Sequence, residues 1–79
     1  MEKKLTTLLQ MAKGQRGTVL QLKGGRGLVN RLNALGIIPG KKITKVSAML
    51  MRGPVTVEVD RIQIAIGFGM ARKIFVNPE

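Results

Sequence analysis

The stretch Arg31-Leu32-Asn33-Ala34-Leu35-Gly36-Ile37-Ile38-Pro39-Gly40-Lys41-Lys42 (residues 31 to 42) combines a helix end with a tight turn. Apolar residues recur at helical spacing from Leu28 to Leu35, which predicts a helix of about two to three turns. Gly36 follows the last of them, where a helix needs a residue with positive φ as its cap. Pro39 then prevents the helix from continuing.

The same stretch has some features of a phosphate-binding loop but does not fit one. Such a loop needs four residues between its glycines, whereas three separate Gly36 and Gly40, and Lys42 stands where Ser or Thr is required. Residues 38–41 instead fit a type II turn, because Pro39 fixes φ and Gly40 supplies positive φ. We therefore predict that Gly36, Pro39 and Gly40 are structural first, and that the stretch is a contact surface second.

Short strands are predicted on both sides of this helix. Gly53 and Pro54 form a second turn, and the strands are expected at residues 18–22, 42–51, 55–60, 62–66 and 73–76. Alternation in the fourth predicts that its three isoleucines, Ile62, Ile64 and Ile66, point inward. The fold class is thus mainly β: a small barrel of about five strands with one short helix inserted after the first strand, since closure removes exposed edges.

The chain has 79 residues, which predicts a single domain spanning residues 1–79, with 1–7 as an extended N-terminal extension and 77–79 as a tail. The longest uncharged stretch near the end, residues 62–71, is about half of what a membrane-spanning helix needs. There is no cysteine, and a reducing cytoplasm is the expected location. A net charge of +10 favours an anionic partner.

The residue types argue against catalysis and metal binding. Histidine, cysteine and tyrosine are absent and Ser47 is the only serine, so no ordinary nucleophile and base pair can form. Zinc, haem and ferrous iron lose their usual ligands. Two of the four acids, Glu58 and Asp60, are expected on one charge-paired face. We predict a non-enzymatic protein with no catalytic residues, no metal site and no cofactor.

Two segments are the candidate partner-binding surfaces. The first is the helix end and turn from Arg31 to Lys42, and the second is the hairpin end at residues 49–52, where three consecutive large apolar residues cannot all face one side. The outward residue could equally pack beneath the helix or the N-terminal segment. The full candidate set is Arg31, Leu35, Ile38, Lys41, Lys42, Lys45, Met49, Met51 and Arg52. Lys41, Lys42 and Lys45 would steer an acidic partner, or would simply be solvated at a strand start.

A nucleic-acid-binding barrel is the alternative. The charge supports it. However, single strands are usually held by aromatic stacking, and Phe68 and Phe75 are the only aromatic residues. No stable nucleic-acid partner is therefore expected, although the charge leaves one open.

Nearly the whole chain, from about Leu8 to Val76, resembles the ferrous-iron transport protein A family, FeoA. The residues that carry the resemblance are Gly14-x-x-Gly17-x-Val19, Leu22-x-Gly24-Gly25, Arg31-Leu32-x-x-Leu35-Gly36-Ile37-x-Pro39-Gly40-x-x-Ile43, Gly53-Pro54-Val55-x-Val57 and Ile64-Ala65-Ile66-Gly67-x-x-Met70-Ala71-x-x-Ile74-x-Val76. The third and fifth segments are specific as a pair.

The resemblance implies an SH3-like barrel in a free-standing cytoplasmic protein. It also implies action together with FeoB, the large membrane ferrous-iron permease, which carries a cytoplasmic G-protein domain. Similar domains at the C-terminus of iron-dependent repressors are interaction modules. The high positive charge is not a feature that the family supplies. Edge strands of the barrel could pair two copies into a homodimer.

Overall fold

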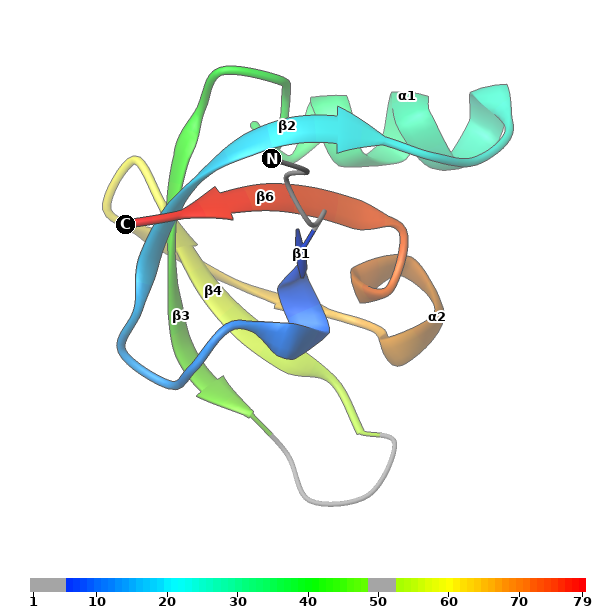
Figure 1. The fold of residues 1–79 in the computed structure, drawn as a ribbon. Helices are drawn as coiled ribbons and strands as arrows, with labels where there is room; N and C mark the ends of the chain where they lie inside the picture. The colour runs from blue at the N-terminus through cyan, green and yellow to red at the C-terminus, as the bar shows by residue number, and fades with distance from the viewer. Residues whose placement is uncertain (1–5, 49–52) are drawn as a thin grey trace.

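A computed structural model describes residues 6–48 and 53–79 of the chain. The elements in chain order are β1 (Thr6–Thr7), the 3-10 turn η1 (Leu8–Gln10), β2 (Arg16–Leu22), α1 (Arg26–Ala34), β3 (Lys42–Ala48), β4 (Val55–Val59), β5 (Ile62–Ile66), α2 (Phe68–Ala71) and β6 (Ile74–Pro78). The predicted class, a mainly β domain with a helix after the first long strand, is confirmed (Figure 1).

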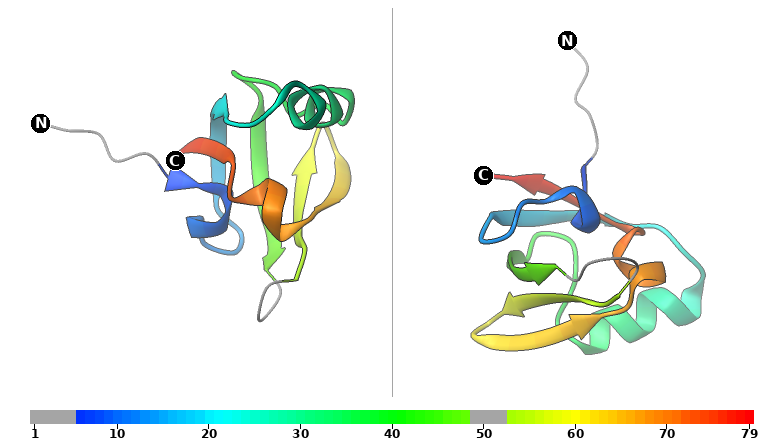
Figure 2. Two further views of the ribbon diagram at one scale, coloured as in Figure 1. Left: turned by 90° about the vertical axis from the view of Figure 1, so that its right-hand side faces the viewer. Right: turned by 90° about the horizontal axis from the view of Figure 1, so that it is seen from below.

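The strands form one antiparallel sheet in the order β1-β6-β2-β3-β4-β5. The first half of β3 pairs with β2, and the register then shifts between Lys45 and Ser47 where β3 pairs with β4. This bulge bends β3, so that β2 and β6 form one layer and β4 and β5 the other (Figure 2, right). The sheet thereby curls into the small barrel that the strand spacing predicts.

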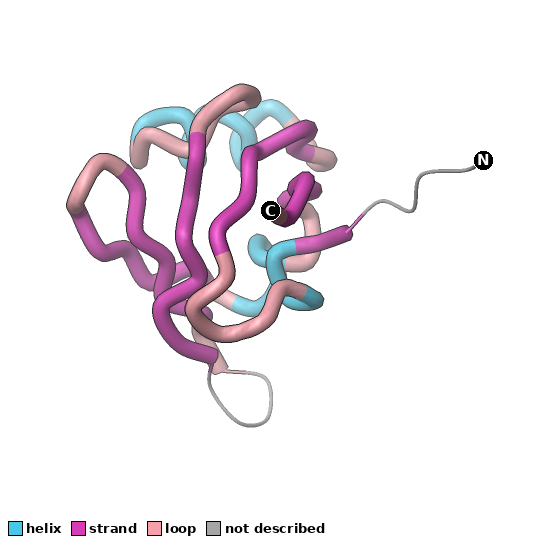
Figure 3. The backbone as a smooth tube through the Cα atoms, turned by 60° about the vertical axis from the view of Figure 1, so that its left-hand side comes forward, coloured by secondary structure: helices cyan, strands magenta, loops and turns pink. Residues whose placement is uncertain are grey.

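Helical segments cover the ends of the curled sheet, where the strands leave the core open. α1 lies across one end of the barrel (Figure 2, left). The helical segments, which are cyan in the tube view, lie outside the magenta strands (Figure 3). α2, which follows β5, contacts η1, which follows β1. Within the described part of the chain, β1 and β5 are the two edges of the sheet and do not pair with each other.

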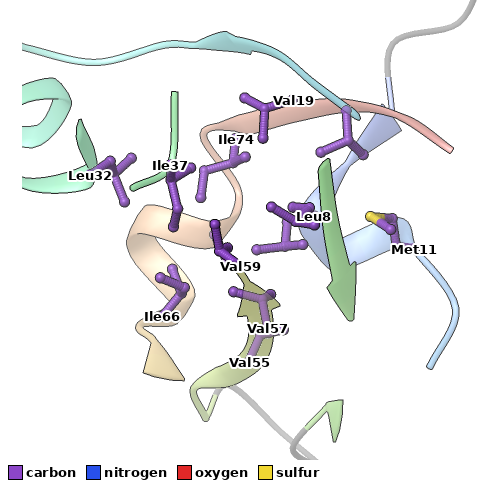
Figure 4. Close-up of a cluster of buried hydrophobic side chains, with 13 residues drawn as sticks. Leu8, Met11, Val19, Leu32, Ile37, Val55, Val57, Val59, Ile66 and Ile74 are labelled. Atoms are coloured by element: carbon purple, nitrogen blue, oxygen red, sulfur yellow. The ribbon is translucent and has the colours of Figure 1, made fainter. Parts of the chain in front are cut away.

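The core is the cluster drawn in Figure 4. It consists of Leu8, Met11, Val19, Leu32, Ile37, Ile43, Val55, Val57, Val59, Ile66, Ala71, Ile74 and Val76. Strict alternation in β4 places all three of its valines inside, as β-strand geometry requires. The contribution of α1 is a single fully buried residue, Leu32, while the rest of the helix is exposed or half-buried.

The structure differs from the sequence prediction at both ends of the chain. Thr6 and Thr7 form β1, which pairs with β6 opposite Val76 and Phe75, where an extended segment without partners was expected. β6 continues to Pro78 and pairs with β2, so most of the expected tail belongs to the sheet. A second short helix, α2, also lies between the strands expected at residues 62–66 and 73–76, where no helix was predicted.

The prediction that all three isoleucines of β5 point inward is wrong for Ile62, whose exposed fraction is 62%. Ile66 is fully buried and Ile64 half-buried. Ile62 pairs with Val59, which is buried, but it lies on β5, an edge strand, so no further strand covers its outer side. The turn between these strands is Asp60-Arg61, both with positive φ (52° and 67°), which is the geometry of a type I′ hairpin.

Candidate partner-binding surface

The end of α1 is fixed by a Schellman motif, as Gly36 predicts. Its φ is 90°, its N–H donates to the carbonyl of Asn33 at 3.0 Å, and the N–H of Ile37 donates to the carbonyl of Leu32 at 2.9 Å. Leu32 and Ile37 are both fully buried, so the apolar contact that accompanies this motif also joins the helix to the core. The chain therefore leaves α1 in a single defined direction.

The turn that follows is tied to the sheet. The N–H of Lys41 donates to the carbonyl of Ile38 at 3.1 Å, and Gly40 has φ 93°, which confirms the predicted turn with Pro39 at its corner. The N–H of Gly40 donates to the carbonyl of Val19 at 2.7 Å, and the N–H of Val19 donates to the carbonyl of Lys41 at 2.8 Å. These two bonds extend the β2–β3 pairing into the turn and hold it rigidly.

Replacement of Gly36 by valine is expected to lower the free energy of unfolding by about 2 kcal/mol or more. A β-branched residue is strained at positive φ, by roughly 1 to 2 kcal/mol before any steric contact is counted. A β-carbon at this position would lie at an ordinary contact distance, 3.7 Å, from Cγ1 of Val59, so the expected loss comes from the backbone strain. Denaturant unfolding of the purified variant measures the loss.

Gly36→Asn is the matched control, because asparagine tolerates the left-handed region. It should retain most of the stability that valine loses. A valine variant as stable as the wild type would show that the cap does not need positive φ.

Two large apolar side chains project from this rigid segment. Leu35 is 40% exposed at the helix cap, and Ile38 is 41% exposed in the turn. We call the exposed side chains of residues 35–42 the turn surface. Arg31, four residues before the start of the turn surface, is exposed on the last turn of α1. The structure thus brings together the predicted residues Arg31, Leu35 and Ile38 on one continuous segment.

Lys41 and Lys42 form ion pairs within the chain. The Nζ of Lys41 lies 2.7 Å from a carboxylate oxygen of Asp60, and the Nζ of Lys42 lies 3.7 Å from one of Glu79. All four side chains are at least one-third exposed, so each pair contributes little to stability. The Lys41 pair joins the turn surface to the β4–β5 hairpin, the tip of which carries the exposed Ile62.

Lys45 departs from the expectation of a solvated charge at a strand start, because it is only 3% exposed. Its ammonium donates to the carbonyls of Leu9 at 2.9 Å and Met11 at 2.7 Å. Burial lowers the pKa of Lys45 from its ordinary value of 10.5. Lys45 therefore fastens η1 and the residue after it to β3, and its charge points inward.

The other predicted contact segment, which contains Met49, Met51 and Arg52, lies outside the described residues. Gly53 and Pro54 directly precede β4 and belong to no helix or strand, in keeping with their predicted place in a turn. Of the two candidate surfaces, the turn surface is the one for which the structure gives geometry.

The described charges are unevenly distributed. One depression of about 280 Å³ mixes both signs, with Arg16, Lys42 and Arg61 beside Glu58 and Asp60, together with Thr44. A second depression, of about 300 Å³, is lined by Lys23, Arg72, Lys73 and Phe75. We call the second one the basic pocket. Sequence reasoning missed it, because Lys23 is distant in sequence from Arg72 and Lys73. The only signal was a basic residue directly after the strand expected at residues 18–22 and two at the start of the strand expected at residues 73–76.

Among residues 6–48 and 53–79, no three His, Cys, Asp or Glu side chains come together in a way that could hold a metal ion. Nor does any described helix have the length and apolar character needed to cross a membrane.

The curled antiparallel sheet, with a helix between its first long strand and the bent β3, places the chain in the class of small SH3-like β-barrels. A family model described as the FeoA domain matches residues 6–78, and the chain belongs to the FeoA family. Family membership, which confirms the resemblance seen in the sequence, gives the chain a role in ferrous iron transport.

Individual relatives agree with this assignment. A putative Fe(2+) transport protein A of Campylobacter jejuni is 30% identical over 71 residues, which cover 90% of this chain and 96% of that protein. The crystal structure of an iron uptake regulatory protein (FeoA) is 29% identical with a TM-score of 0.88, covering 96% of this chain and all of that one. A manganese-dependent transcriptional repressor, 18% identical with a TM-score of 0.88, covers 100% of this chain, which spans 44% of the repressor, and shares the fold alone.

Proposed function

We propose that this protein is a non-enzymatic cytoplasmic accessory protein of ferrous iron transport. It acts by contacting the cytoplasmic face of a FeoB-type membrane permease, including its G-protein domain. The observation that supports this proposal best is the pair of exposed apolar side chains, Leu35 and Ile38, held out on a segment whose backbone is fixed.

The rigidity of the turn surface matters for binding. Ordering a loop on association costs free energy, which reduces affinity. Here the Schellman motif at Gly36 and the two hydrogen bonds to Val19 already hold the segment in place. Apolar side chains on such a preorganised segment can enter a pocket of a partner without that cost, and surrounding charges would set the orientation.

The residue inventory supports a role without catalysis. The described residues provide no cluster of metal ligands, and the sequence has no histidine, cysteine or tyrosine. A ferrous ion prefers such ligands or several carboxylates. The protein would therefore assist iron movement through protein contact, and iron would be held by the permease.

Replacement of Ile38 by glutamate is expected to weaken binding to the purified cytoplasmic portion of a matched permease by about tenfold or more. Truncation or charge introduction at a central apolar anchor typically costs about 1.4 to 2 kcal/mol or more. Ile38 is already 41% exposed and its backbone carbonyl, which closes the turn, is unaffected, so the fold should survive. Calorimetric titration of both proteins measures the change.

Leu20→Glu is the matched control. Leu20 is 46% exposed on β2 and the substitution changes the net charge equally, but the residue lies outside the turn surface. Its affinity should stay within about twofold of the wild type. Equal losses in both variants would move the contact away from the turn surface.

The net charge of +10 favours one second candidate, a nucleic-acid-binding barrel. A labelled RNA oligomer added as competitor at two salt concentrations separates the two functions. Permease binding that resists RNA and moderate salt supports the accessory role. Binding to RNA alone, with a steep loss as salt rises, would assign the function to the charge.

A further inference from the structure

The basic pocket lies at the end of the molecule that has no described acid. Glu58, Asp60 and Glu79 are the acids among residues 6–48 and 53–79. Asp60 lies in the β4–β5 turn, Glu58 lies in β4 just before it, and Glu79 is at the C-terminus; this turn and the C-terminus lie on the left of Figure 1. The β2–α1 connection and α2, which bracket the basic pocket, lie on the right. The positive charge at this end is therefore not offset by neighbouring carboxylates.

The fold places the residues of the pocket together through the backbone. Lys23 follows the last residue of β2, and its N–H donates to the carbonyl of Lys73, just before β6, at 2.9 Å. Phe75 of β6 pairs with Gln21 of β2. The Nζ of Lys23 lies 5.3 Å from the centre of the Phe75 ring. Lys23 and Lys73 thus stand beside two hydrogen-bonded strand ends, and Arg72 is the C-cap of α2 directly before Lys73.

We propose that the basic pocket binds the phosphate groups of a small phosphate ester with an aromatic base, of the size of a nucleoside diphosphate. Lys23, Arg72 and Lys73 supply three positive charges with no acid in the lining. One carboxylate would neutralise a single charge, whereas a diphosphate carries enough charge to balance all three. Arginine offers paired donors to phosphate oxygens, and lysine acts as a point charge.

The ring of Phe75 indicates which kind of group the ligand carries besides its phosphates. It is half-buried and forms the apolar portion of the lining, beside the cations. The ammonium of Lys23 lies over this ring, so an aromatic base stacks on it when that exposed side chain turns toward the phosphate groups. The depression of about 300 Å³ is at the small end of ligand sites, which suits a mononucleotide rather than a track for a polymer. This inference is independent of the proposed permease contact.

The test is calorimetric titration at low salt with four probes: inorganic pyrophosphate, ADP, a single-stranded RNA oligomer and vesicles of anionic lipid. Saturable one-to-one binding of ADP, tighter than that of pyrophosphate, is expected. Arg72→Glu should weaken ADP binding about tenfold or more. Lys13→Glu changes the net charge equally but lies before β2, at the opposite end from Lys23, and should alter ADP affinity less than twofold.

Phe75→Leu tests the aromatic contact. It should weaken ADP binding severalfold and leave pyrophosphate binding nearly unchanged. Proton–nitrogen correlation spectra confirm that each variant is folded. Equal losses in Arg72→Glu and Lys13→Glu would overturn the proposal in favour of general charge attraction. Binding of RNA or vesicles without ADP or pyrophosphate, or binding of no probe, would also overturn it.

Discussion

Replacement of Lys45 by methionine is expected to lower the free energy of unfolding by about 2 to 4 kcal/mol. Methionine has a similar length and keeps the packing of the side-chain stem, but it cannot donate to the carbonyls of Leu9 and Met11. Each buried acceptor left without a partner costs roughly 1 to 3 kcal/mol. Methionine also removes the cost of burying a charged ammonium, which offsets part of this loss of stability.

This loss is large for so small a domain. A chain of 79 residues has a total stability of about 4 to 12 kcal/mol. Chemical denaturation, followed by circular dichroism, measures the change. Lys13→Met removes an exposed lysine in the neighbouring turn and should change stability by less than about 0.5 kcal/mol. If the Lys45 variant were as stable as the wild type, the desolvation cost would equal the worth of the two hydrogen bonds.

Lys45 also makes the free energy of unfolding depend on pH. Burial lowers the pKa of Lys45 in the folded protein below 10.5. At pH values between this lowered pKa and 10.5, the folded protein binds fewer protons than the unfolded chain. Stability then rises with pH in that interval, and is constant with respect to this group below the folded pKa. The free energy of unfolding of the wild type minus that of Lys45→Met should therefore increase as pH approaches 10.5. Contributions that are common to both proteins cancel in this difference. A flat difference would show that burial does not perturb this amine.

Lys45 illustrates why part of the site could not be read from the sequence. Alternation puts it on the same face as the buried Ile43, which conflicts with its charge. The conflict is resolved by carbonyls of Leu9 and Met11, more than thirty positions earlier in the chain. No local pattern shows that a distant segment will present two acceptors at that point. The inward position follows from the alternation, although a solvated or partner-facing Lys45 was predicted, and the hydrogen-bonding partners have no local signal.

The cap and turn were predictable because their causes are local. Positive φ at Gly36 and Gly40 and the fixed φ of Pro39 act within a few residues, and the structure has φ of 90° and 93° at the two glycines. Ile62 was mispredicted because its exposure depends on β5 being an edge strand, which the alternation of apolar residues does not show. The basic pocket was missed for a similar reason, since Lys23 meets Lys73 only through the pairing of β2 with β6. Sequence reasoning thus succeeds for turns and fails for tertiary neighbours.

Replacement of Leu32 by alanine is expected to lower the free energy of unfolding by about 2 to 5 kcal/mol. Leu32 is fully buried, and it is the residue through which α1 reaches the core. Truncation removes apolar burial and leaves a cavity that a small barrel can close only partly. It also removes one side of the contact with Ile37 that accompanies the helix cap, so the direction of the turn surface would loosen as well.

Leu35→Ala, three positions later, is the control for the same chemical change, because Leu35 is 40% exposed. It should cost less than about 1 kcal/mol. Denaturant unfolding of both variants, with unchanged dependence on denaturant concentration, isolates the cavity effect. Permease binding separates the two roles further: Leu35→Ala should weaken binding while the protein stays folded, whereas Leu32→Ala should lose stability first. Equal stability of the two variants would mean that α1 is not anchored by Leu32, and that the turn surface is held by the hydrogen bonds to Val19 alone.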